Sequence, residues 1–228
     1  MKQVRKMTFL EECIRDSIPI WEQCLQTDFL QKMAAGELDE ECLKGYIVDD
    51  SLYLREYARV FAWGIIRAEC MEEIRVLYSL LAFVNENEDA ARLRYLSYFK
   101  LTDGQIQTMA LRTENQAYID TMIEAARTGR GAAECLMACL PCMLSYSWIF
   151  TRMVKATPGV LETLSGAMVE EYAAESYAQL CRQWTEAADE ICRQISPERR
   201  RKCRAVFRKC SEHELEFWNM SARKREDL

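Results

Sequence analysis

The sequence has a single histidine, His213, in 228 residues, so one chain cannot build a histidine-rich metal site. This scarcity argues against zinc chemistry, and we expect no metal. Glycine and proline are also scarce, at eight and four residues, while hydrophobic residues make up 50% of the chain. This balance favours long helices over frequent turns, and it predicts an all-α fold.

The chain also lacks long apolar runs and concentrated positive charge. We expect none of the apolar runs in the sequence to be long enough to cross a membrane, and therefore we expect no membrane partner. Acidic and basic residues are interspersed and the net charge is -6, so no basic stripe offers itself to nucleic acid. The basic run Arg199–Lys202 is interpreted as a solvated helix face. Residues 1–228 are expected to form a single domain with a large core.

Eleven cysteines would suggest a disulfide framework in a short secreted chain, but this chain is long and the count is odd. The first residues, Met1–Met7, are charged and do not resemble a signal peptide. We therefore expect reduced thiols and a cytoplasmic location.

Apolar residues recur at helical spacing along most of the chain, and short breaks divide the pattern. The spacing predicts helices over roughly 10–33, 39–65, 71–99, 132–156 and 160–195, and a last helix from residue 197. Capping-box spacing at Thr8, Thr102 and Thr113 predicts three helix starts, and Ser196 before a proline predicts another.

An apolar helical segment, Ala138–Tyr146, combines a proline, two thiols and a phenol. Pro141 removes a backbone hydrogen bond inside a helix and predicts a bend beside Cys142. Tyr146 follows Cys142 by four residues, so the phenol and the thiol lie on one face, one turn apart. The two side chains can point into the same cavity, which makes Cys142 a candidate functional thiol.

The same cysteines have two other interpretations. Free cysteine is among the most buried residue types, so Cys139 and Cys142 could be small hydrophobic core residues. Cys135, Cys139 and Cys142 also have the spacing of the radical S-adenosylmethionine iron–sulfur motif. That motif belongs on a loop after a strand, whereas these thiols lie in a helical pattern without βα alternation. The context contradicts the match.

The helix predicted over residues 39–65 carries polar groups in its apolar face. Asp50 and Tyr53 are three residues apart, so they share a side. A solvated acid on an exposed stripe is the alternative for Asp50, while the nearby tyrosines favour a site. Acids meet aromatic residues again in the last helix, at Glu212–Trp218.

Four pieces of the chain, taken in order, resemble the thiaminase II (TenA) family. They are Gly36–Leu38 with Tyr46–Leu54, similar to Gly-x-Leu and Gln-Asp-x-x-Tyr-Leu; Leu140–Tyr146, similar to Leu-Pro-Cys-x-x-x-Tyr; Glu214–Trp218, similar to Glu-x-x-Phe-Trp; and Ala117–Tyr118 with Glu171–Tyr172, in the places of two pocket tyrosines. Their order and separation argue against chance agreement. The resemblance implies the all-helical haem-oxygenase-like bundle of that family, without haem.

The resemblance also implies roles for individual residues. Cys142 would be the catalytic thiol and Glu214 its acid–base partner, while Asp50 would hold an aminopyrimidine ring. The tyrosines implied to line or hydrogen-bond the pocket are Tyr53, Tyr118, Tyr146 and Tyr172. No metal or organic cofactor is implied.

Four positions depart from the family pattern. Asp49 stands where glutamine is usual, Met143 and Ser147 where bulkier aromatic residues are frequent, and Asn219 where glycine often occurs. These departures leave the core chemistry intact and concern the outer wall of the pocket.

A cysteine at position 142 resembles the thiol-bearing branch of the family. Its members cleave a substituent from the methylene at position 5 of a 4-amino-2-methylpyrimidine and release hydroxymethylpyrimidine. The implied function is an aminopyrimidine aminohydrolase, or thiaminase II, acting in thiamin salvage. Family members are usually homotetramers, so the expected partners are a small pyrimidine substrate and further copies of the chain.

Two other functions stay open. A non-catalytic pyrimidine-binding or regulatory protein could keep the same pocket, because a fold does not fix a function. An oxidase on the same scaffold would use carboxylate and histidine ligands, and the single histidine argues against it.

Overall fold

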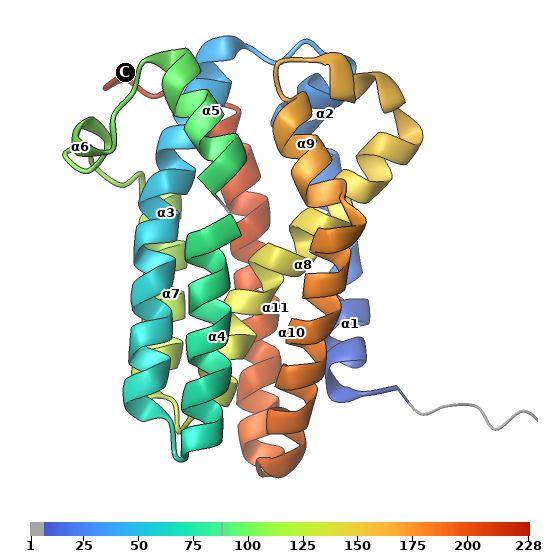
Figure 1. Ribbon diagram of the computed structural model, residues 1–228. Helices are drawn as coiled ribbons and strands as arrows, with labels where there is room; N and C mark the ends of the chain where they lie inside the picture. The colour runs from blue at the N-terminus through green and yellow to red at the C-terminus, as the bar shows by residue number, and fades with distance from the viewer. Residues whose placement is uncertain (1–6, 88) are drawn as a thin grey trace, which may run out of the picture.

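The computed structural model describes residues 7–87 and 89–228, and in this part of the chain the backbone forms helices and loops without strands. The all-α prediction is therefore confirmed. Figure 1 shows the long helices side by side in a bundle, with the shorter α2, α5, α6 and α9 toward one end. The elements are α1 (Phe9–Leu25), α2 (Asp28–Ala35), α3 (Glu40–Arg67), α4 (Met71–Asn87), α5 (Asp89–Phe99), α6 (Asp103–Ile106), α7 (Thr113–Thr128), α8 (Ala132–Ala156), the 3-10 helix η1 (Pro158–Glu162), α9 (Gly166–Ala173), α10 (Glu175–Gln194) and α11 (Pro197–Ser221).

Most of the predicted helix starts are formed by the capping residues named from the sequence. The capping boxes at Thr8 and Thr102 are complete, and the Ser196 side chain caps α11. Thr113 is the exception. It is the first residue of α7, whose N-cap is Arg112 without a side-chain cap bond, so the capping-box prediction there is wrong.

Three predicted helices, over residues 10–33, 71–99 and 160–195, are each divided into separate elements in the structure. Between α1 and α2 the Thr27 hydroxyl donates to the Cys24 carbonyl (2.7 Å), which occupies an acceptor at the end of α1. The helix predicted over residues 71–99 is described as α4 and α5, and the one predicted over residues 160–195 divides into η1, α9 and α10. A Cβ at Gly166 would lie 2.1 Å from the Leu161 carbonyl oxygen, so the backbone folds back on itself where only glycine fits.

The central element is α8, which packs against α3, α7, α9, α10 and α11. Pro141 lies inside this helix without ending it. By length and composition α8 could cross a membrane, contrary to the expectation from the sequence, but 83% of the apolar window is buried within the bundle. Its apolar character is accounted for by its place in the core.

Two apolar clusters fill the interior, and α8 runs through both. One contains Trp21 and Trp184 with the first half of α8, and the other contains Tyr46 and Trp218 with its second half. Cys142 packs against both clusters. The thiol predicted to be functional therefore lies at their boundary.

Candidate active site

Cys142 on α8 and Glu214 on α11 form the central polar pair of the site. The Cys142 thiol faces the Glu214 carboxyl closely enough to stabilise its ionised form. The same carboxyl accepts a hydrogen bond from the Tyr118 hydroxyl of α7, with 2.7 Å between Oη and Oε1. Glu214 is 2% exposed, whereas Cys142 is half-buried. Three helices thus bring together a nucleophile, an acid and a phenol.

The environment of Glu214 changes its protonation. Burial raises the pKa of Glu214 to about 8, and the negative charge of Asp50 acts in the same direction. The hydrogen bond from Tyr118 and the neighbouring Cys142 thiol stabilise the carboxylate and oppose the shift. At neutral pH the group is therefore mostly protonated, yet close enough to its pKa to exchange a proton. Such a carboxyl suits general acid–base chemistry.

Asp50 on α3 is a buried carboxyl, so the alternative of a solvated acid on an exposed stripe is wrong. The residue is 9% exposed, and burial raises its pKa to about 7. The charge of Arg92 opposes this shift, while Asp49 and Glu171 add to it. A carboxyl kept in a buried position at this cost to its charged form favours a polar ligand beside it.

The four predicted tyrosines lie in two contacting pairs. The rings of Tyr53 and Tyr118 are 5.1 Å apart, and those of Tyr146 and Tyr172 are 5.0 Å apart at 74°. Burial raises the pKa of Tyr146 well above its usual value, and the charge of Asp50 adds to this effect together with those of Cys142 and Glu214. Tyr146 is therefore a neutral phenol in the electrostatic field of all three groups.

The other two thiols of α8 serve the core. Cys135 and Cys139 are fully buried, and Cys135 Sγ donates to the Val60 carbonyl (3.5 Å). The described residues contain no cluster of three or more histidine, cysteine or acidic side chains that could hold a metal ion. Cys142 lies inside α8 beside Glu214, so the geometry gives the iron–sulfur interpretation no support.

Comparison with known proteins identifies the family to which this site belongs. The model of the family described as TENA/THI-4/PQQC matches residues 15–224, which include every site residue above. The chain belongs to the TENA/THI-4/PQQC family. The resemblance inferred from the four sequence pieces is thereby confirmed at the level of the family.

Relatives of this TENA/THI-4/PQQC family member include proteins named aminopyrimidine aminohydrolase. The one from Helicobacter pylori is 27% identical over 205 residues, which cover 89% of this chain and 93% of that protein. The one from Halalkalibacterium halodurans is 26% identical over 221 residues, which cover 96% and 97%. These names support a hydrolase at the level of the family.

Solved structures confirm the predicted haem-oxygenase-like bundle. A TenA homologue protein from P. horikoshii OT3 has a TM-score of 0.81 at 23% identity and covers 96% of this chain and 100% of that chain. A domain from Shewanella denitrificans OS217, described as having a heme oxygenase-like fold, has a TM-score of 0.72 at 12% identity and covers 96% and 93%. At these identities the likeness concerns the fold alone.

Two aromatic residues without a predicted role complete the site in this TENA/THI-4/PQQC family member. The hydroxyls of Tyr46 and Tyr146 are 3.3 Å apart, and the Tyr46 ring stacks on Trp218 at 5.6 Å and 7°. Tyr46 precedes Asp50 by four residues, so helical spacing places it on the same face and was a usable signal. Trp218 lies in the Glu214–Trp218 piece of the family pattern, but the sequence does not show that it stacks on Tyr46 of another helix.

His213, the single histidine of the chain, packs against Tyr118, whose hydroxyl donates to Glu214. Its ring stacks on Tyr118 at 5.3 Å and 18°. Nε2 lies 2.9 Å from Thr121 Oγ1, and Nδ1 lies 2.9 Å from Glu216 Oε2. Burial lowers the pKa of His213 although Glu216 opposes the shift. A largely neutral imidazole therefore packs behind Tyr118.

Three departures from the family pattern have different surroundings. Met143 is buried in the core, and Ser147 hydrogen-bonds to Cys181 of α10. Asn219 is exposed.

Proposed function

We propose that the protein is an aminopyrimidine aminohydrolase of the thiaminase II type, releasing hydroxymethylpyrimidine from thiamin-related 4-amino-2-methylpyrimidines. The observation that carries this proposal is the buried Glu214 carboxyl, which accepts from the Tyr118 hydroxyl at 2.7 Å and lies beside the Cys142 thiol. A nucleophile beside a buried acid is what attack on an aminopyrimidine ring requires. The names of relatives at 26% and 27% identity support the same substrate class.

The reaction begins with activation of the ring. An aminopyrimidine is a poor electrophile until a ring nitrogen is protonated or hydrogen-bonded, and the acid form of Glu214 supplies that proton. The Glu214 carboxylate left by this transfer takes the proton of the Cys142 thiol, and the thiolate adds to the activated ring to form a carbon–sulfur bond. The hydrogen bond from Tyr118 holds the carboxyl in place.

Addition of the thiolate prepares departure of the substituent. Electrons move from the ring toward the methylene, and the substituent leaves with its bonding pair, either as a neutral thiazole or as an amine that takes a proton from Glu214. Water attacks the resulting exocyclic alkene and loses a proton, and loss of the Cys142 thiolate and of the ring proton restores aromaticity. This chain's own residues supply the nucleophile and the proton, so the proposal includes no metal or organic cofactor.

Asp50 is proposed to accept a hydrogen bond from the exocyclic amino group of the ring. A carboxylate accepts without donating, which matches an amino group. The aromatic rings of Tyr53, Tyr146 and Tyr172 supply flat surfaces for the heterocycle. The predicted binding residues thus receive roles that fit their chemistry.

Asp50→Asn should weaken binding as well as slow turnover. The amide presents a donor where the ligand also donates, so a charged hydrogen bond is replaced by a mismatch. We expect the Kd for 4-amino-2-methylpyrimidine, measured by calorimetry, to rise by a factor on the order of 10 or more. Equal affinity of the variant and the wild type would remove Asp50 from substrate binding.

We further propose that the protein acts in thiamin salvage in the cytoplasm and assembles as a homotetramer. The eleven cysteines are free thiols, which fits a reducing compartment. Exposed hydrophobic side chains that support contacts between copies include Ile66, Met71, Tyr78 and Tyr98.

Hydrolysis by the purified protein tests the function. Thiamin and 4-amino-5-aminomethyl-2-methylpyrimidine are incubated separately, and hydroxymethylpyrimidine is measured by chromatography. Release from either compound supports the proposal, and the ratio of the two rates identifies the preferred leaving group. Binding of both compounds without turnover would instead favour the non-catalytic pyrimidine-binding protein.

A further inference from the structure

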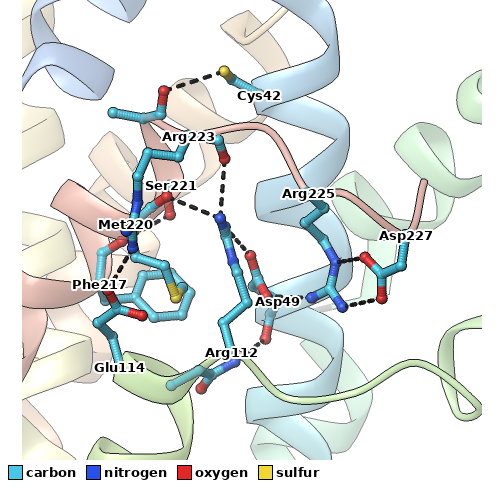
Figure 2. Close-up of polar contacts among 12 residues, drawn as sticks. Cys42, Asp49, Arg112, Glu114, Phe217, Met220, Ser221, Arg223, Arg225 and Asp227 are labelled. Carbon is cyan, nitrogen blue, oxygen red and sulfur yellow. Dashed lines mark hydrogen bonds and ion pairs between the residues drawn. The ribbon is translucent and has the colours of Figure 1, made fainter.

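The C-terminal segment, residues 222–228, lies against the first half of α3, the helix that carries the proposed substrate-binding carboxyl (Figure 2). The Cys42 thiol donates to the Ala222 carbonyl (3.4 Å). Gly45, three residues further along α3, leaves room for the segment, because a Cβ there would meet Arg225 Cγ at 3.3 Å. The segment is therefore closely fitted to α3.

Asp49, the neighbour of Asp50 in the chain, anchors this contact. It is fully buried, and each of its carboxylate oxygens is bound by a guanidinium: Oδ1 by Arg225 Nη1 (2.5 Å) and Oδ2 by Arg112 Nη2. Its carbonyl oxygen accepts from Asn115 Nδ2 of α7 (2.9 Å). Because Asp49 is held by both side chain and backbone, Asp50 has little freedom to move.

Arg112 joins three of the helices that supply polar groups of the site. It is the N-cap residue of α7, and it binds Asp49 of α3. Its Nη1 also donates to the carbonyls of Met220 and Arg223 (both 3.0 Å), at the end of α11 (Figure 2). Carbonyls at a helix C-terminus lack partners within the helix. One guanidinium thus fixes α3, α7 and α11 relative to one another.

Arg225 completes the arrangement. It is 7% exposed, it donates to the Ala110 carbonyl (2.7 Å), and its Nε and Nη2 each lie 2.8 Å from a carboxylate oxygen of Asp227. Burial opposes its charge, but the carboxylates of Asp227 and Asp49 outweigh this effect and raise the pKa of the guanidinium. Arg225 therefore stays charged beside Asp49.

We propose that Asp49, Arg112 and Arg225 form a clamp that positions Asp50 relative to Glu214. The three are positioning residues that do not touch the substrate, and the inference rests on the proposed function because it concerns the same site. The clamp ties α3, which carries Asp50, to the end of α11, which carries Glu214. A misplacement of about 1 Å in such a site can lower a rate by about 100-fold.

Asp49→Asn tests the clamp with little risk to folding. Arg225 keeps Asp227 and a carbonyl as acceptors, and Arg112 keeps two carbonyls, so neither guanidinium is left without a partner. We expect kcat to fall by about 10-fold or more and the Kd for 4-amino-2-methylpyrimidine to rise, both measured well below thermal unfolding. Glu226→Gln, which alters an exposed neighbour of Arg225, is the matched control and should equal the wild type.

Two substitutions at Arg225 test the Asp49–Arg225 ion pair by changing the guanidinium instead of the carboxylate. Arg225→Met leaves Asp49 paired with Arg112, while Arg225→Lys keeps the positive charge. We expect the methionine variant to resemble Asp49→Asn and the lysine variant to recover part of the rate. A purely structural contact predicts lower melting temperatures with unchanged kcat and Kd in all three variants, and that result would overturn the clamp.

Alkylation of Cys142 by iodoacetamide gives a readout that needs no substrate. Since Glu214 of α11 lies beside Cys142, a shift of α11 changes the surroundings of the thiol, and exposed Cys70 is an internal reference in the same digest. We expect the ratio of the two rates to change several-fold in Asp49→Asn and not in Glu226→Gln.

The two proposals fail in different ways. A wild-type protein that cleaves no aminopyrimidine defeats the proposed function, and the clamp is then judged by the alkylation ratio. An active wild type in which Asp49→Asn and Glu226→Gln give the same kcat, Kd and alkylation ratio defeats the clamp alone.

Discussion

Cys142→Ser is expected to fold normally and to bind the aminopyrimidine, yet to lose nearly all hydrolysis. At neutral pH a free thiol is partly thiolate, whereas a hydroxyl is a far weaker nucleophile. The side chain is half-buried, and a serine hydroxyl can hydrogen-bond to Glu214, so the surroundings need not change. Release of hydroxymethylpyrimidine should fall by a factor on the order of 1,000 or more, while the Kd stays close to that of the wild type.

The two buried thiols of the same helix are matched controls. Cys135 packs tightly against α3, since a Cβ at Gly64 would lie 2.7 Å from its sulfur, and Cys139 is also fully buried. Cys135→Ala and Cys139→Ala should each cost at most about 1–2 kcal/mol of stability and leave hydrolysis nearly unchanged.

The comparison of the three variants separates the interpretations of these cysteines. A core role for all three predicts similar, modest losses of stability and no special effect at Cys142. An iron–sulfur site predicts a coloured protein in which every one of the three is essential, so an ultraviolet–visible spectrum of anaerobically purified protein belongs in the experiment. Substantial hydrolysis by Cys142→Ser would exclude the nucleophilic role.

Local signals in the sequence were sufficient for most of the helix starts predicted from capping residues, Thr113 being the exception. A capping box needs only two residues three positions apart, and those at Thr8 and Thr102 are formed as predicted. The breaks were not predictable in the same way. The fold-back at Gly166 depends on the approach of a backbone carbonyl from Leu161, and nothing in the helical periodicity of residues 160–195 marks that approach.

The site shows the same division. Helical spacing alone placed Tyr146 one turn from Cys142, and both residues lie in the electrostatic cluster around Glu214. The partners of that cluster on other helices could not be derived from spacing. Asp49 and Arg225 are 176 positions apart, and an acid beside Asp50 looks like any other polar residue until the folded chain brings the guanidinium to it.

Glu214→Gln should slow turnover by a factor on the order of 100 or more while leaving ligand affinity close to that of the wild type. Glutamine has nearly the shape of the acid, and its carbonyl oxygen can still accept from Tyr118, so the site should keep its geometry. The amide cannot transfer a proton to the ring nitrogen. Measuring kcat and Kd separately distinguishes this loss from weakened binding, and unchanged turnover would remove Glu214 from the mechanism.

The pH dependence of hydrolysis tests the same role independently. If the acid form of Glu214 donates the proton, wild-type turnover should fall as pH rises through about 8, the pKa that burial produces. Glu214→Gln has no such group, so this alkaline decline should be missing from its residual activity, while titration of the substrate affects both proteins equally. A decline that persists in the variant would assign the proton to another group. Asp50, whose pKa burial raises to about 7, is the first carboxyl to test in that case.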